Sequence, residues 1–324
     1  RFFGPYTEKL WGISPTEISS DWAAQRISLL HLGDVILRLM GLRSGGSRSY
    51  AKRYLYPKHG IGQLFSRMAE EIEALGGEIR YGSAVTGLHS EAADFGSDRR
   101  IRAVRVRAMT PDGPDGETAE LPADQVISTM SLSSLVTMLA QSEALPGSSH
   151  EALRAASQLR FRAVRFLNLK LNRPEFSPHT WMYVSEPRYL MTRIQEPRHR
   201  SPYAAPPGKT SLMLEIPCQV GDRVFCASTA EIFERCLRDL EGLGFRDLAR
   251  DSLGCFSTFV EEGYPVYQLG YQAQRQRALD YAARFTNLTS CGRQGAFRYV
   301  FMDTALEMGM LAAERALEGD RRAA

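Results

Sequence analysis

The residues with the clearest chemical potential lie near the C-terminal end, in the segment NLTSCGRQGAFRYVFMDTALEMG. A short apolar strand, predicted over 287–292, ends at Gly292, and a glycine lets the backbone approach a ligand closely. Further on, an amphipathic helix is predicted to begin near Asp303. Its unpaired N–H groups suit an anionic or electron-rich ligand. The segment therefore predicts a binding corner between a strand end and a helix start, although a glycine turn before a capped helix is the simpler alternative.

The same segment resembles the cofactor-binding tail of a flavoprotein superfamily that includes amine oxidases, protoporphyrinogen oxidases, phytoene-type desaturases and UDP-galactopyranose mutases. The resemblance implies non-covalent FAD, with the helix start at the flavin end, where a positive field stabilises the reduced ring. The cofactor-binding residues implied here are Gly292, Arg293, Gly295, Tyr299, Met302, Asp303 and Thr304.

Two earlier segments resemble the same superfamily. In YPKHGIGQLFSRMAEEIEALGGEIRYGSAVTGL, the resemblance implies that Val85 contacts the adenine end of FAD through its backbone. The loop has His59-Gly60 where the superfamily more often has two adjacent glycines. Lys58 in that loop either faces the flavin as a substrate-binding residue or is simply solvated. The second segment, PYTEKLWG with ISSDWAAQRI, is similar to a stretch that precedes the substrate-domain helices.

The segment EEGYPVYQLGYQAQ resembles the superfamily's return from substrate sheet to FAD domain. Its tyrosines, among them Tyr267, either line a substrate pocket or pack half-buried at a strand end. Arg193 is a further substrate-binding candidate. Arg165, Arg193 and Arg293 are candidates for a site that grips a nucleotide diphosphate, because planar guanidinium groups bind phosphates in bidentate fashion.

One superfamily feature is missing from the sequence. No strand followed by G-x-G-x-x-G and a helix occurs, although that loop normally holds the pyrophosphate of the cofactor. The chain opens on RFFGPYTEKLWG, which is typical of a protein interior rather than of a start. We therefore expect an N-terminally truncated member that binds FAD weakly or not at all and is itself inactive.

Helices and strands are predicted in an order that indicates an α/β fold. It combines an incomplete Rossmann-like FAD/NAD(P)-binding domain, whose first βαβ is missing, with an inserted α+β substrate domain on a mixed, mostly antiparallel sheet. The predicted domains are a helical part of the substrate domain at 1–55, FAD-binding segments at 56–145 and 271–324, and the substrate-binding domain at 146–270.

The composition bears on whether the protein binds nucleic acid, a membrane or a metal, and on where in the cell it is expected. The net charge of +3 on 324 residues requires neither nucleic acid nor a membrane, and no apolar run is long enough for a transmembrane helix. Five cysteines form no C-x-x-C pair, which favours reduced thiols in a cytoplasmic protein. The six histidines make no ligand-spaced cluster with them, so no metal site is predicted. The oligomeric state stays open.

No nucleophile with its base can be identified, and no catalytic residue is assigned. This pattern suits flavin chemistry, in which the cofactor performs the difficult step. The first hypothesis is an FAD-dependent oxidoreductase that oxidises a small organic substrate by hydride transfer. The alternative is an isomerase similar to UDP-galactopyranose mutase, in which reduced flavin acts as a nucleophile without net redox.

Overall fold

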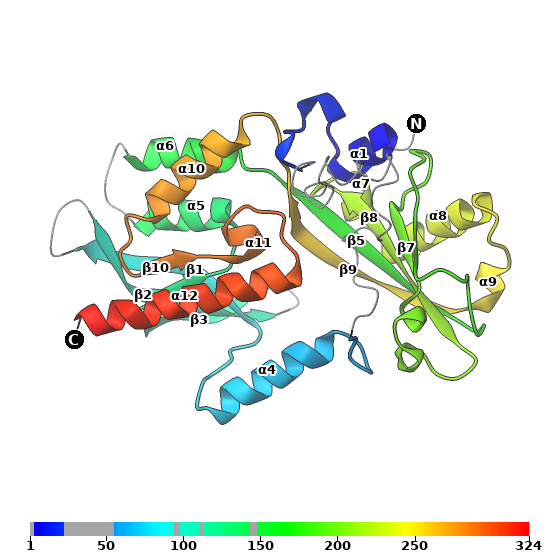
Figure 1. Cartoon of the computed structure of the whole chain (residues 1–324), viewed down its shortest axis with the longest axis horizontal. Coiled ribbons are helices and arrows are strands. Elements are labelled where there is room, and N and C mark those ends of the chain that lie inside the picture. Colours follow the sequence, from blue (N-terminus) through cyan, green and yellow to red (C-terminus); the bar gives the residue numbers. More distant parts are fainter. Residues whose placement is uncertain (1–2, 23–54, 94–97, 111–112, 143–147, 324) are drawn as a thin grey trace, which may run out of the picture. The chain divides into compact units, whose positions relative to one another are not determined.

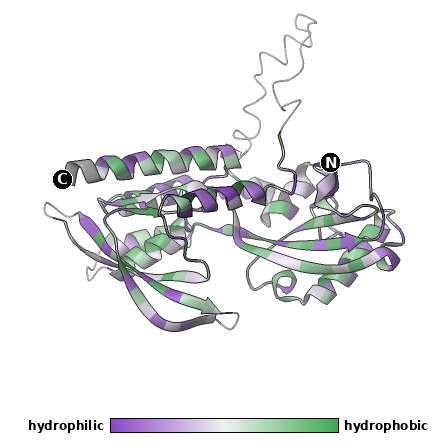
Figure 2. Ribbon diagram, turned by 90° about the horizontal axis from the view of Figure 1, so that it is seen from below, coloured by the Kyte–Doolittle hydropathy of each residue, from purple (hydrophilic) through white to green (hydrophobic). Residues whose placement is uncertain are grey.

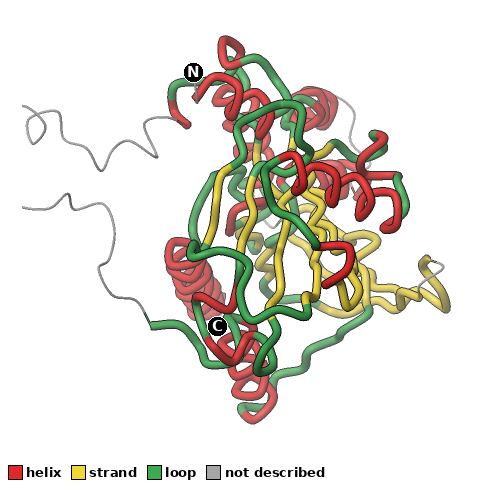
Figure 3. Tube along the Cα trace, turned by 90° about the vertical axis from the view of Figure 1, so that its right-hand side faces the viewer, coloured by secondary structure: helices red, strands yellow, loops and turns green. Residues whose placement is uncertain are grey.

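The computed structural model describes residues 3–22, 55–93, 98–110, 113–142 and 148–323. The described residues form both helices and strands, as the mixed α/β prediction requires (Figure 3). The chain divides by its internal contacts into two compact units. Unit 1 comprises 1–77, 163–261 and 267–269, and unit 2 comprises 78–162, 262–266 and 270–324.

A five-stranded sheet in the order β6-β7-β8-β5-β9 forms the centre of unit 1 (Figure 1). The pairs β6–β7, β7–β8 and β8–β5 are antiparallel, which confirms the antiparallel sheet expected from the sequence. Its strands are β5 (Phe161–Leu171), β6 (Trp181–Tyr183), β7 (Arg193–Gln195), β8 (Thr210–Cys218) and β9 (Ser252–Pro265).

The core of unit 1 lies between one face of this sheet and the helix α8 (Thr229–Gly242). Strand residues alternate between the two faces. The helix-facing side chains Leu167, Leu169 and Leu171 of β5 are completely buried, as is Leu214 of β8. Ser228 caps α8 with Glu231 in a reciprocal capping box, so the helix begins where the sequence predicts.

The remaining helices of unit 1 are short or peripheral. Every described residue of α4 is exposed or half-buried, and the helix ends just before Gly76 at φ +88°. The helical part of the substrate domain predicted at 1–55 lies mostly outside the described residues. The elements are α1 (Phe3–Trp11), α4 (Gly62–Ala74), α7 (Arg223–Cys226), α9 (Leu248–Asp251) and the 3-10 helices η1 (Pro15–Glu17), η2 (Pro197–His199) and η3 (Pro202–Ala204).

Unit 2 contains two small sheets. One is the antiparallel meander β1-β2-β3, and the other is the parallel pair β10-β4. The strands are β1 (Ser83–Ala92), β2 (Arg99–Thr110), β3 (Gly113–Pro122), β4 (Val126–Ser128) and β10 (Leu288–Ser290). The helices are α5 (Leu132–Ser142), α6 (Ser148–Ser157), α10 (Tyr271–Ala282), α11 (Gly292–Gly295) and α12 (Met302–Ala323).

Four of these elements go beyond the sequence predictions. β3 includes the turn-favouring residues Gly113 and Gly116, because the pairing with β2 decides its conformation. α5 and α6 follow β4 without being predicted. Residues 292–295 form a single helical turn rather than a simple glycine turn. The helix beginning near Asp303 is confirmed as α12.

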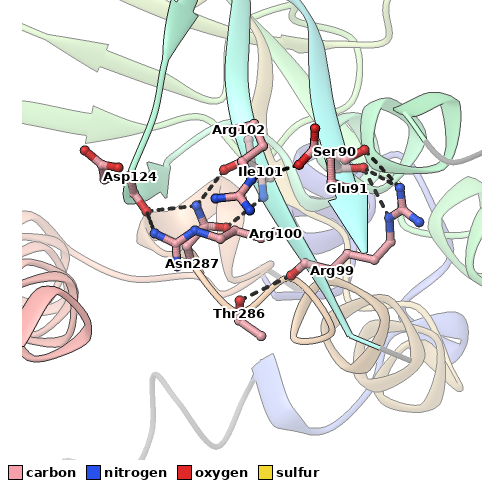
Figure 4. Close-up of polar contacts among 9 residues, drawn as sticks. All are labelled: Ser90, Glu91, Arg99, Arg100, Ile101, Arg102, Asp124, Thr286 and Asn287. Atoms are coloured by element: carbon pink, nitrogen blue, oxygen red, sulfur yellow. Dashed lines mark hydrogen bonds and ion pairs between the residues drawn. The ribbon is translucent and has the colours of Figure 1, made fainter. Parts of the chain in front are cut away.

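The two sheets of unit 2 are joined by the side chain of Asn287, which is 2% exposed (Figure 4). Its Oδ1 accepts a hydrogen bond from Ile101 N at 2.9 Å, and its Nδ2 donates to Ile101 O at 2.8 Å and to Asp124 O at 2.9 Å. The side-chain amide thus replaces the strand neighbour that β2 lacks at this point. Asn287 fixes the start of β10, and so also the Gly292 corner that follows.

Candidate functional site

The carboxyl ends of the parallel strands β4 and β10 form the best candidate site. Ser128 pairs with Ser290, and Cys291 N donates to Ser128 O at 2.9 Å, so both strands end at one edge. In open α/β sheets ligands bind outside the carboxyl ends of parallel strands. Ser131, directly after β4, donates its hydroxyl to Glu262 Oε1 at 2.6 Å and accepts from Ser134 N at the start of α5.

Two glycines at this edge have opposite surroundings. Gly292 has φ +80°, and a Cβ at this position would meet nothing within 4 Å. A Cβ on Gly295 would lie 2.9 Å from Ser290 Oγ and 3.1 Å from Ser128 O. Gly295 therefore allows α11 to pack directly on β4, whereas Gly292 leaves open space beside the backbone, as a ligand-binding corner requires.

The hydroxyl of Ser128 is the clearest unexplained polar group at this edge. Its Oγ is buried and has no hydrogen-bond partner among the described residues. Ser128 also lines a cavity of about 860 Å³ that runs along β4 and reaches Val85, Met130 and Leu135. Buried polar groups are nearly always bonded, so an orphaned hydroxyl in a cavity points to a missing partner. Sequence reasoning missed this residue, whose only signal is its place at the end of an apolar strand.

The start of α12 supplies unpaired donors. Ala305 is the first residue of this helix with a bonded N–H, to Phe301 O at 2.9 Å. Among the described residues, the N–H groups of Met302, Asp303 and Thr304 have no acceptor and are the open donors of the helix start. Asp303 is exposed in the first turn, and Met302 is 44% exposed.

Arg293 holds the segment between α11 and α12 in place. Its guanidinium donates to Val300 O at 2.7 Å and to Gly263 O at 3.3 Å. It also lies 5.3 Å from the ring centre of Tyr264 and 5.0 Å from that of Tyr299. These contacts make Arg293 a positioning residue for the loop, and they orient Tyr299 through a cation–π interaction.

The predicted substrate residues lie in unit 1. Lys58 is exposed with its Nζ 4.1 Å from the Tyr203 ring centre. Arg193 forms an ion pair with the buried Glu215, and Tyr267 is only 2% exposed, with its carbonyl oxygen bonded to Ser19 N. The structure brings none of these three into contact with another, and their roles stay predictions.

Arg165 is not available to a ligand. It is 1% exposed and donates to the carbonyl oxygens of Val224 and Ala227 and to Ser257 Oγ. Its partners lie on the α8 side of the sheet, whereas the register places Arg193 opposite Glu215, whose side chain points to the other face. Arg165 and Arg193 therefore do not form a phosphate-binding pair.

All five cysteines are free thiols. Burial raises the pKa of the Cys291 thiol, next to the Gly292 corner, and raises that of Cys236 to about 12. A thiol with a raised pKa is a poor nucleophile at neutral pH, so Cys291 does not offer thiolate chemistry. Within the described ranges no three His, Cys, Asp or Glu residues are grouped to hold a metal, and no helix has the length and hydropathy to cross a bilayer.

Comparison with known families identifies the chain. The sequence profile of the flavin containing amine oxidoreductases matches residues 11–317. The chain belongs to this family. FAD is its cofactor, and the open Gly292 corner, the orphaned Ser128 hydroxyl and the free donors of α12 fit such a group. No curated protein matches the chain at a significant level.

Solved structures share the fold. A reduced UDP-galactopyranose mutase is similar with a TM-score of 0.66 at 20% identity, covering 92% of this chain and 59% of that one. A putative protoporphyrinogen oxidase from Exiguobacterium sp. 255-15 has a TM-score of 0.64 at 18% identity, covering 97% and 63%. Cyclohexylamine oxidase from Brevibacterium oxydans IH-35A has a TM-score of 0.58 at 16% identity, covering 98% and 64%. The chain therefore spans less than two thirds of the length of these proteins.

Proposed function

We propose that this chain carries the flavin-side half of an FAD-dependent oxidoreductase that oxidises a small organic substrate, with an amine as the first class to test. The observations that carry the proposal are the open backbone at Gly292 and the buried hydroxyl of Ser128, which has no partner among the described residues; both follow from strands that end at the same edge. In this family the bound flavin accepts a hydride from the substrate. The substrate itself is proposed from the family alone.

Each residue at the edge of β4 and β10 has a defined part in the proposal. Gly292 lets the cofactor approach the backbone, and Ser128 donates its free hydroxyl into the cavity. The N–H groups at the start of α12 present positive partial charge to the electron-rich end of the cofactor. Val85, which lines the same cavity as Ser128, contacts the adenine end. Lys58, Arg193 and Tyr267 are proposed to act on the substrate side.

A second candidate is an isomerase of the UDP-galactopyranose mutase kind. It is favoured by the structural likeness to that protein and by the Arg293, Tyr264 and Tyr299 cluster beside the site. The isolation of Arg165 and the ion pair of Arg193 weigh against it, because a diphosphate needs free guanidinium groups. The oxidoreductase is therefore the first proposal.

Cofactor binding is tested with two matched glycine variants. Gly292 and Gly270 have φ values of +80° and +82°, and a Cβ added to either glycine would meet no atom within 4 Å. Alanine at either position costs about 1–2 kcal/mol of backbone strain. We expect Gly292→Ala to weaken saturable FAD binding at least tenfold in equilibrium dialysis, and Gly270→Ala to leave it within twofold, which corresponds to a site effect of about 1.4 kcal/mol or more.

The absence of a G-x-G-x-x-G loop makes weak binding the expectation, so the dialysis extends to high FAD concentrations. Equal affinity in the two glycine variants would contradict the proposed site. The chemistry is tested on FAD-loaded protein. Loss of the oxidised flavin absorbance on anaerobic addition of primary amines supports oxidation. Isomerisation of a UDP-sugar by the reduced protein, without electron acceptor, supports the mutase instead.

A further inference from the structure

A second cavity lies wholly within unit 1, on the face of the five-stranded sheet opposite α8. It measures about 490 Å³, within the roughly 300–1,000 Å³ of pockets that hold drug-sized molecules. The register pairs Lys170 with Ser211, so both side chains stand on this face, beside that of Asn168 two residues earlier. The opposite face is filled by the leucines that pack on α8.

The walls of this cavity are mainly apolar. Phe256 and Leu253 of β9 are about half exposed, at 48% and 49%, and form one side. The stretch that includes η3 forms the other side through Ala204 and Ala205. Large apolar groups left half exposed on the wall of a cavity are suited to an apolar ligand body.

The charged side chains that line the cavity are both positive. They are Lys170 and Lys209, and no Asp or Glu is among the described residues that line it. Neither ammonium group has a carboxylate partner in the described part of the chain. Arg198 donates to Lys209 O at 2.6 Å, which fixes the backbone of Lys209, while the buried carboxylate of Glu196 accepts from the Thr210 hydroxyl at 2.7 Å.

Two polar side chains in the cavity also lack partners among the described residues. The Asn168 side-chain amide is half-buried and makes no hydrogen bond to another described residue, and the same holds for the Ser211 hydroxyl. Lys170 Nζ lies 5.8 Å from the Phe256 ring centre, so a cation stands directly beside an apolar surface. This combination matches a ligand with an apolar body and a negative end.

We propose that this cavity is a binding site for a small amphipathic carboxylate, separate from the β4–β10 edge. Phe256 and Leu253 contact the apolar body, Lys170 and Lys209 pair with the carboxylate, and Asn168 donates its amide. A cationic amine is disfavoured here by the two ammonium groups, so the site is distinct in chemistry from one for an amine substrate. The proposal goes beyond the flavin function and does not depend on it.

Three probes of similar shape test the charge preference, with binding measured by calorimetry on the full chain without added FAD. The probes are 2-naphthoate, its neutral counterpart 2-acetylnaphthalene, and the cation 2-naphthylmethylamine. We expect 2-naphthoate to bind about tenfold more tightly than the neutral probe. The amine is expected to bind least. Equal affinity for all three, or preference for the amine, overturns the proposal.

Variants locate the binding. Lys170→Met and Lys209→Met are each expected to weaken 2-naphthoate about threefold to tenfold, while the neutral probe stays within about twofold. Arg238→Met on α8 removes an equal charge away from the cavity and serves as the control. Ser211→Phe fills the cavity and is expected to block both probes. An unchanged preference in the double lysine variant, or an equal loss in Arg238→Met, places the binding elsewhere and refutes this site.

Discussion

Helix α8 of unit 1 and helix α12 of unit 2 bury their apolar side chains to very different degrees. In unit 1, Leu167, Leu214 and Leu240 are completely buried between the sheet and α8. In unit 2, the long helix α12 buries only Ala312 among its described hydrophobic side chains, and Met310 is 68% exposed. Figure 2 shows hydrophobic segments alternating with hydrophilic ones along this helix. A surface helix normally turns its apolar stripe inward, and the described side chains of α12 depart from this pattern.

The two units also differ in whether a buried polar side chain is hydrogen-bonded. The guanidinium of Arg165 in unit 1 is sealed in the core and donates to backbone carbonyls and a serine hydroxyl, whereas the hydroxyl of Ser128 in unit 2 is buried without a partner among the described residues. The first arrangement holds the sheet and the α7–α8 turn together. The second leaves a hydroxyl free for a ligand. Burial alone therefore does not distinguish a structural group from a functional one, but hydrogen-bond satisfaction does.

The largest expected effect is a leucine truncation in unit 1. Leu214→Ala leaves a cavity in a filled core and is expected to lower the free energy of unfolding by about 2–5 kcal/mol. Met310→Ala on α12 removes a mostly exposed side chain and is expected to change it by no more than about 0.5 kcal/mol. Urea denaturation of both variants measures the contrast. A large loss in Met310→Ala would show that α12 buries its apolar stripe in solution.

A smaller effect is expected from the polar junction of unit 2. Asn287→Ala removes three hydrogen bonds and leaves the N–H and the C=O of Ile101 without these partners, for a loss of about 1–3 kcal/mol. Hydrogen exchange at Ile101 N–H should accelerate at the same time. Arg100→Ala, which removes an exposed contact to Asp124 O in the same cluster, is the matched control, with a change of under about 0.5 kcal/mol. Unchanged exchange at Ile101 would mean that the backbone alone holds the junction.

The smallest effect concerns Lys9, where unit 1 has a partly buried charge. Its Nζ donates to Val184 O, Glu186 O and Met191 O, and burial lowers its pKa from 10.5 to about 8. The unfolded chain therefore keeps this proton to higher pH than the folded one, and the contribution of Lys9 to stability rises between pH 8 and 10.5. Comparing wild type with Lys9→Met by denaturation across this window measures it. A difference that stays flat or falls with pH excludes the shift.

The sequence predicted those strands and helices in which apolar residues recur at the spacing of the element itself. β5, β8 and α8 have regular apolar periodicity, so the local sequence indicates each of them. β3 was hidden because turn residues such as Gly113 and Gly116 sit inside a strand that exists only through its pairing with β2. The reason lies in tertiary contact, which outweighs local preference.

At the site, the sequence indicated Gly292 and the start of α12, since a glycine after a short strand and a helix start leave a local pattern. Ser128 could not be found in this way, because its importance depends on the absence of a partner in space. The sequence also could not predict that Arg165 and Arg193 lie on opposite faces of the sheet, because strand register decides which face each side chain takes. The cavity with Lys170 and Lys209 likewise joins residues from separate strands and loops.

The pairing of Asn287 with Ile101 has a consequence for how rigidly the β10 end is located. In a regular strand ladder, a shift of register by two residues again pairs every peptide group. Backbone pairing alone therefore does not fix a single register. The side-chain amide of Asn287 bonds the N–H and the C=O of Ile101, and no other described side-chain amide bonds Ile101 to replace these bonds after a shift. A displacement of β10 relative to the meander breaks all three hydrogen bonds of the Asn287 side chain together. Asn287 therefore opposes a shift in the register of β10.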